Sequence, residues 1–78
     1  MIQLDLSGLK CPLPALKTRK ALRAMQRDRQ LEVICTDPLA SIDIPNLVRE
    51  CGDILEECRQ EGRKLVFTIR RASGKAGR

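Results

Sequence analysis

The chain alternates apolar and polar residues over three short segments, residues 2–6, 31–36 and 63–71. Such alternation places the apolar side chains on one face and is typical of a half-buried β-strand. Residues 53–61 show the pattern more weakly, because glutamates interrupt it, and Gly62 separates them from the last segment. We therefore expect four strands, of which the last two form a hairpin. Their apolar faces would comprise Ile2, Leu4 and Leu6, then Leu31, Val33 and Cys35, and finally Leu65, Phe67 and Ile69.

A helical period appears in a segment between the first two strands. It predicts a helix from about Pro12 to about Met25 or Gln26, since proline is well tolerated in a first turn. Leu13 and Leu16 point away from the core in this helix, which makes them candidate partner contacts. The core-facing arc would comprise Cys11, Pro14, Ala15, Thr18, Ala21, Leu22 and Met25.

A second helix is predicted from about residue 41 to Cys51. Ser41 or Asp43 could cap its start, Pro45 fits its first turn, and Gly52 is a plausible stop. The preceding Asp37 is expected to form a turn through hydrogen bonds from nearby backbone N–H groups. The buried stripe of the helix would comprise Ile44, Leu47, Val48 and Cys51.

The predicted element order is therefore β-α-β-α-β-β, in one domain over residues 1–71. Two helices cannot cover both faces of a small sheet, so we expect an α/β two-layer sandwich with a four-stranded mixed sheet and both helices on one face. Residues 72–78 form a basic tail without apolar anchors and are expected to be disordered.

Composition narrows the chemistry that this domain can perform. The chain has no histidine, so a Cys–His hydrolase is excluded, and its four cysteines contain no C-x-x-C pair, which disfavours structural zinc and a thioredoxin-like cycle. No cofactor is predicted. No apolar run approaches a membrane span and the N-terminus does not resemble a signal peptide, so we expect a cytoplasmic protein without a membrane partner.

Charge is unevenly distributed along the chain. Residues 1–31 carry seven basic and two acidic residues, residues 32–69 carry four and eight, and residues 70–78 carry four and none. Such a distribution suits an acidic protein surface or a phosphate backbone. The solvent side of the first helix would carry the basic residues Lys17, Lys20, Arg23 and Arg27.

Cys11 lies in the segment KCPLP, at the start of the first predicted helix. The helix dipole, the Leu13 N–H group and the neighbouring Lys10 would all favour the thiolate form of this residue. Pro12 and Pro14 would present the sulfur on a stiff turn. A lone thiolate can exchange with other thiols, bind a metal or carry a group on sulfur.

The segment CPLP, following a short strand and LSGLK and opening an amphipathic helix, resembles the C-P-x-P motif of the TusA/SirA-like sulfur carrier family. Asp37–Pro38, the segment DIP at residues 43–45 and the terminal IRR resemble the family too, so that the likeness covers about residues 2–71. The resemblance implies that Cys11 accepts sulfane sulfur as a persulfide and passes it on. It also implies a cysteine desulfurase or rhodanese-like donor and a DsrE-type or other acceptor, in tRNA thiolation, molybdenum cofactor or sulfur-oxidation pathways.

Two other functions stay open at this point. The chain could be a small basic RNA-binding or regulatory module, although its single aromatic residue, Phe67, points to the core and disfavours specific nucleic-acid recognition. It could also be a redox sensor that pairs Cys11 with Cys35, a residue otherwise expected in the core. Cys51 is expected in the core and Cys58 to be partly exposed. We expect a monomer.

Overall fold

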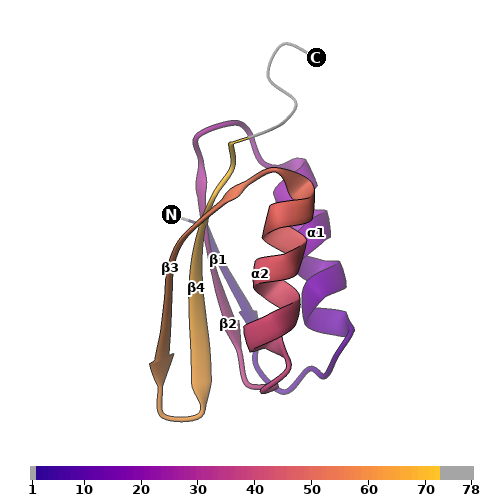
Figure 1. Ribbon diagram of the computed structural model, residues 1–78, viewed down its shortest axis with the longest axis vertical. Coiled ribbons are helices and arrows are strands. Elements are labelled where there is room, and N and C mark those ends of the chain that lie inside the picture. The colour runs from indigo at the N-terminus through magenta and orange to yellow at the C-terminus, as the bar shows by residue number, and fades with distance from the viewer. Residues whose placement is uncertain (1, 73–78) are drawn as a thin grey trace.

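The computed structural model describes residues 2–72, which form one layer of helices packed on one sheet (Figure 1). The sheet has the strand order β1-β2-β4-β3, in which β1 and β2 are parallel and the other pairs are antiparallel. This arrangement confirms the predicted two-layer fold. In chain order the elements are β1 (Ile2–Leu6), α1 (Leu13–Ala24), β2 (Gln30–Cys35), α2 (Ala40–Cys51), β3 (Ile54–Glu61) and β4 (Lys64–Arg70).

The parallel pairing of β1 with β2 determines where the two helices begin. Leu6 and Cys35, the last residues of these strands, are register partners. Each strand is followed by a helix, so α1 and α2 both start at the same end of the sheet (Figure 1). The loops that lead into the two helices are therefore neighbours in space, although they are about 30 residues apart in the chain.

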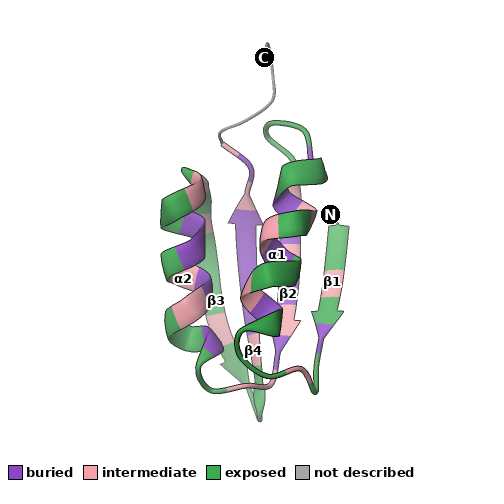
Figure 2. Ribbon diagram, turned by 90° about the vertical axis from the view of Figure 1, so that its right-hand side faces the viewer, coloured by how far each residue is buried: buried purple, intermediate pink, exposed green. Residues whose placement is uncertain are grey.

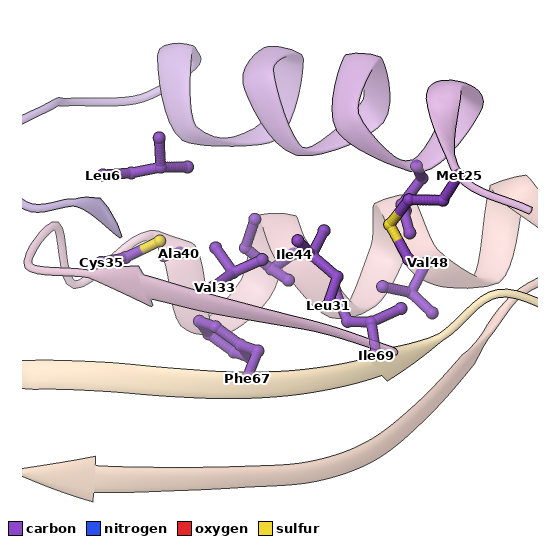
Figure 3. Close-up of a cluster of buried hydrophobic side chains, with 11 residues drawn as sticks. Leu6, Met25, Leu31, Val33, Cys35, Ala40, Ile44, Val48, Phe67 and Ile69 are labelled. Carbon is purple, nitrogen blue, oxygen red and sulfur yellow. The ribbon is translucent and has the colours of Figure 1, made fainter. Parts of the chain in front are cut away.

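The core lies between the helices and the sheet, where side chains from both layers meet (Figure 3). The apolar faces predicted for β2 and β4 lie here, and Leu31, Val33, Phe67 and Ile69 have no exposed surface. Burial of each such side chain contributes about 1.5–3 kcal/mol. The helices complete this core mainly with Leu22, Met25, Ile44 and Val48.

The first helix begins one residue later than predicted, because Pro12 is its N-cap residue. Pro14, Thr18 and Leu22 face the core as predicted, and the Thr18 hydroxyl donates to the Pro14 carbonyl at 2.7 Å. Cys11 was predicted on the same arc, and this is wrong: the residue precedes the helix and is exposed. A residue outside the helix does not follow its 100° period.

The second helix begins earlier than predicted, at Ala40, with Leu39 as its N-cap residue and no side-chain cap. The predicted cap at Ser41 or Asp43 is therefore wrong, and both residues lie in the first turn of α2. Pro45 consequently lies inside the helix rather than in its first turn. The predicted stop is confirmed, since Gly52 adopts the left-handed conformation with φ of 77°.

The sheet face that carries no helix is closed over its centre by side chains. Val66 and Thr68 of β4 point to this face yet are 4% and 7% exposed. Arg59 of β3 lies beside them and bridges to Glu32 of β2 at 3.5 Å. Strand β4 is consequently buried on both faces, whereas the edge strands β1 and β3 are mostly exposed (Figure 2).

The described chain ends at a buried ion pair. Arg71 Nη1 lies 3.0 Å from Asp53 Oδ2, and the side chains are 6% and 0% exposed. The Ala72 N–H group donates to Asp53 Oδ1 at 3.0 Å, so Ala72, predicted as the first residue of the tail, is anchored. The remainder of the predicted tail, residues 73–78, lies outside the described residues. Within residues 2–72, neither helix is long and apolar enough to cross a membrane.

Candidate functional site

Asp37 joins the loops that precede the two helices. Its carboxylate accepts a hydrogen bond from the Cys11 backbone N–H at 2.5 Å and another from the Leu39 N–H at 3.0 Å. These bonds, together with the charge of Lys10, hold the pKa of Asp37 below its usual value. The predicted turn-forming role of Asp37 is confirmed, and the contact with Cys11 shows that it also positions the KCPLP segment.

The Cys11 thiol faces a carboxylate of the other helix. Sγ lies 2.9 Å from Oδ2 of Asp43, in the first turn of α2, and donates a hydrogen bond to it. This bond, partial desolvation and the negative charges of Asp43 and Asp37 raise the pKa of the Cys11 thiol. The prediction of a favoured thiolate is therefore wrong for the free protein, because the fold brings the carboxylates of Asp43 and Asp37 close to the sulfur.

The predicted supporting groups act differently from what the sequence suggested. The Leu13 N–H group donates to the Lys10 carbonyl at 2.9 Å, not to the sulfur. Lys10 acts electrostatically on Asp37. Pro12 occupies the N-cap position of α1, and Pro14 is buried in its first turn.

A groove between α1 and α2 begins at Cys11. Its volume is about 330 Å³, and its lining includes Leu16 of α1 and Asp43 of α2. Arg19 and Glu50, whose side chains pair at 3.5 Å, lie further along it and also border a second hollow of about 220 Å³. The residues that line the groove are Cys11, Pro12, Ala15, Leu16, Arg19, Asp43, Asn46, Leu47 and Glu50.

Exposed apolar side chains occur at the start of both helices. Leu13 and Leu16 of α1 are 44% and 56% exposed, as predicted. Leu39 and Ile42 at the start of α2 are 51% and 58% exposed and were missed. Their position outside the buried stripe of α2 was the signal that could have identified them. We call Leu13, Leu16, Leu39 and Ile42 the apolar rim.

The basic side of α1 is exposed as predicted through Lys17, Lys20 and Arg23. Arg27, predicted on the same side, is also exposed but lies beyond the helix, which ends at Ala24. We call these four residues the basic face. Arg19, which borders the groove, was not predicted as a site residue. Its half-exposed side chain signals a position between the core and the solvent.

The other three cysteines occupy different environments. Cys35 is fully buried, as predicted, and burial together with the charge of Asp37 raises the pKa of its thiol to about 11. Cys51, predicted in the core, is only partly buried, because it ends α2 and borders the second hollow. Cys58 is exposed. Cys11 is thus the cysteine that combines exposure with a place on the groove.

The arrangement limits the chemistry available to Cys11. The chain has no histidine that could act as a base. Among residues 2–72, no three histidine, cysteine, aspartate or glutamate side chains gather closely enough to hold a metal ion. An exposed sulfur beside one carboxylate, on an open groove, is suited to accepting and releasing a group on sulfur.

Comparison with known proteins gives a consistent result. The family model described as "Sulfurtransferase TusA" matches residues 2–71. The "Sulfur carrier protein TusA" of Allochromatium vinosum is 41% identical over 70 residues, covering 90% of this chain and 92% of that protein. A "Putative sulfur carrier protein" of Neisseria meningitidis serogroup B is 43% identical over 67 residues, covering 85% and 86%. The crystal structure of a SirA-like protein from Desulfitobacterium hafniense shares the fold, with a TM-score of 0.79, 20% identity and coverage of 94% of this chain and 100% of that one.

Proposed function

Because this chain belongs to the TusA family of sulfur carriers and sulfurtransferases, we propose that Cys11 holds sulfane sulfur as a persulfide and relays it between two proteins. The observation that carries this proposal is the placement of Cys11, an exposed thiol where two helix starts meet an open groove. A carrier must be reached by two different partners, and an exposed sulfur on an open groove permits this.

The transfer is balanced without any external oxidant. Cys11 Sγ attacks the outer sulfur of a donor persulfide, a new S–S bond forms, and the S–S bond of the donor breaks. The donor thiolate leaves with the electron pair and takes up the proton that Cys11 loses. The outer sulfur keeps its oxidation state, so the residues present suffice for the step. The reverse attack by an acceptor thiol unloads the carrier.

The partners that fit this chemistry are a cysteine desulfurase or rhodanese-like donor and a DsrE-type or other acceptor. The apolar rim would supply buried contact area around the sulfur, while the basic face would steer an acidic partner surface toward it. The sulfur could then serve tRNA thiolation, molybdenum cofactor or sulfur-oxidation pathways. The domain over residues 1–71 would act as a monomer in the cytoplasm.

The two alternative functions receive less support. Phe67 has no exposed surface, so the chain offers no aromatic side chain for stacking on a base. Cys35 is fully buried, with a pKa raised to about 11, which makes it a poor partner for disulfide exchange with Cys11.

Sulfur loading tests the proposal. Incubation with a cysteine desulfurase, pyridoxal phosphate and cysteine should add the mass of one sulfur atom, which dithiothreitol removes. The Cys11→Ser variant should gain nothing, whereas Cys58→Ser should load like the wild type, since both residues are exposed and either change leaves the core intact. Circular dichroism confirms that each variant is folded. A folded Cys11→Ser protein that still takes up one reducible sulfur would refute the role of Cys11.

The same assay measures docking. A Lys17→Glu, Lys20→Glu, Arg23→Glu variant should stay folded, because these side chains are exposed, but should load about tenfold or more slowly at low ionic strength. Its reaction with a small disulfide should match the wild type, since the thiol itself is unchanged. Equal loading rates at low salt would exclude the basic face from partner binding.

A further inference from the structure

Asp43 is the side chain that the Cys11 thiol contacts most closely, at 2.9 Å from Sγ to Oδ2. The two residues come from different helices, so the folded chain alone brings them together. A carboxylate is an unexpected neighbour for a sulfur nucleophile, because its charge disfavours the thiolate that must attack. The contact between Asp43 and Cys11 therefore does not activate the thiol in the free protein, and its function must be a different one.

From this geometry we propose that Asp43 is a gate. It holds empty Cys11 as a neutral, hydrogen-bonded thiol, and a cationic side chain of the sulfur donor opens the gate by pairing with Asp43 in the docked complex. The proposal rests on the proposed carrier function and adds two features to it, a resting state that resists reaction and a chemical requirement on the donor.

The charges around the sulfur support the first feature. Asp43 approaches from α2, Asp37 from the loop before α2, and Lys10 adjoins Cys11 in the chain. Lys10 acts on Asp37, whereas within the described part of the chain no lysine or arginine lies within 4.0 Å of the Asp43 carboxylate. Further along the groove, Arg19 pairs with Glu50. Among the described residues, the charge nearest to Sγ is thus negative and has no basic side chain within 4.0 Å.

The second feature follows from the accessibility of this pair. Cys11 is exposed, and Asp43, although partly buried, lines an open groove, so a partner can reach the carboxylate without disturbing the core. An arginine or lysine placed against Asp43 would neutralise its charge and remove the acceptor that holds the thiol proton. The sulfur would then attack the outer sulfur of the donor persulfide, and the proton would leave with the donor thiolate.

The gate also distinguishes the loaded carrier from the empty one. A persulfide is more acidic than a thiol, so a loaded Cys11 carries an anionic outer sulfur without a hydrogen for Asp43. Like charges repel, which directs that sulfur away from α2. The same carboxylate that lowers the reactivity of the empty thiol would therefore help to expose the outer sulfur of the loaded carrier to an acceptor.

Charged thiol reagents provide a direct test with the intact protein. Cys11 is modified with cationic trimethylammonium-ethyl methanethiosulfonate and anionic sulfonato-ethyl methanethiosulfonate, and adducts are mapped by mass spectrometry. The ratio of cationic to anionic rate should fall about threefold to tenfold in Asp43→Asn at low salt, and this difference should shrink in 1 M salt. The rate with neutral iodoacetamide should rise, with its pH profile displaced to lower pH.

Two references make this measurement specific. Cys58 in the same molecule is an exposed thiol away from the groove, and its rates should be equal in both proteins. Asp28→Asn is the matched control, since Asp28 is exposed and its positive φ of 69° suits asparagine. An unchanged pH profile and charge ratio for Cys11 in Asp43→Asn would overturn the gate.

Loading by a cysteine desulfurase tests the requirement on the donor. The Asp43→Asn thiol should react faster with iodoacetamide, yet its loading should not rise in proportion. The ratio of the loading rate to the iodoacetamide rate should be at least about threefold lower than in the wild type, because the cation of the donor has lost its partner. Loading that rises in parallel with alkylation would overturn the cationic requirement. If wild-type protein does not load at all, the carrier function fails, while the reagent measurements still decide whether Asp43 holds the resting thiol.

Discussion

Two carboxylates at opposite ends of α2 perform contrasting tasks. Asp43, in the first turn, accepts a hydrogen bond from an exposed thiol and lines an open groove. Asp53, two residues beyond the helix, has no exposed side-chain surface and pairs with buried Arg71. The same chemical group thus contacts an exposed sulfur at one end of the helix layer and pairs with a buried arginine at the other.

The two aspartates differ in how far solvent reaches their carboxylates, and not only in their partners. At Asp43 the solvent screens the charge, so its effect falls mainly on the neighbouring thiol and little on the folded state. At Asp53 both charges are removed from water, and either one left alone would be unpaired in the protein interior. Arg71 depends on this partner further, since its Nε is buried without a hydrogen-bond partner among residues 2–72.

The largest expected effect is on stability at the buried end. Asp53→Asn should lower the free energy of unfolding by about 3–5 kcal/mol, because it leaves the Arg71 guanidinium buried without its counter-charge. Urea unfolding followed by circular dichroism measures the loss, with Asp28→Asn as an exposed control that should unfold like the wild type. A loss no larger than that of the control would mean that the pair is hydrated in solution.

At the exposed end the same substitution should have little effect on stability. Asp43→Asn removes a solvent-screened charge and keeps the shape of the side chain, so its urea midpoint should shift by only a small fraction of the Asp53→Asn shift. Its effect should appear instead in the reactivity of Cys11. A large destabilisation by Asp43→Asn would contradict the distinction, since it would make the thiol contact a structural one.

The smallest expected effect is on the pH dependence of the unfolding free energy in acid, when Asp37 is replaced. Hydrogen bonds from Cys11 and Leu39 hold its pKa below the ordinary value of 3.8, so their stabilisation is fully present above that value. It is lost as the pH falls through the lowered pKa of the folded state. In Asp37→Asn the unfolding free energy should therefore decline less steeply with acidification below pH 4. Superimposable profiles for variant and wild type would show that Asp37 does not contribute.

The strands and the core were predictable because each depends on residues near one another in the chain. Alternation identified β2 and β4, and the residues predicted to face inward, such as Leu31, Val33 and Phe67, are fully buried. Helix ends were predicted less accurately. Leu39 rather than Ser41 or Asp43 is the N-cap of α2, since its helix starts directly after the Asp37 turn without a side-chain cap.

The exposure of Leu13 and Leu16 likewise needed only local knowledge, whereas Cys11 was wrongly placed on the core-facing arc of the helix. The surroundings of the sulfur needed more. Asp43 is 32 residues from Cys11 in the chain, and a helical period assigns it only to a face of its own helix. Nothing in the local pattern indicated that its carboxylate, rather than the Leu13 N–H group, would be the partner of the sulfur.

The sequence by itself determined the elements, the faces that they bury and the cysteine proposed to carry sulfur, because these follow from short-range periodicity and from a motif of adjacent residues. Only the tertiary structure decided the electrostatic state of that residue. The parallel pairing of β1 with β2 places both helix starts at one end of the sheet and brings Asp37 and Asp43 to Cys11. The pKa of a thiol depends on charges within a few ångströms, and those charges here come from a distant part of the chain.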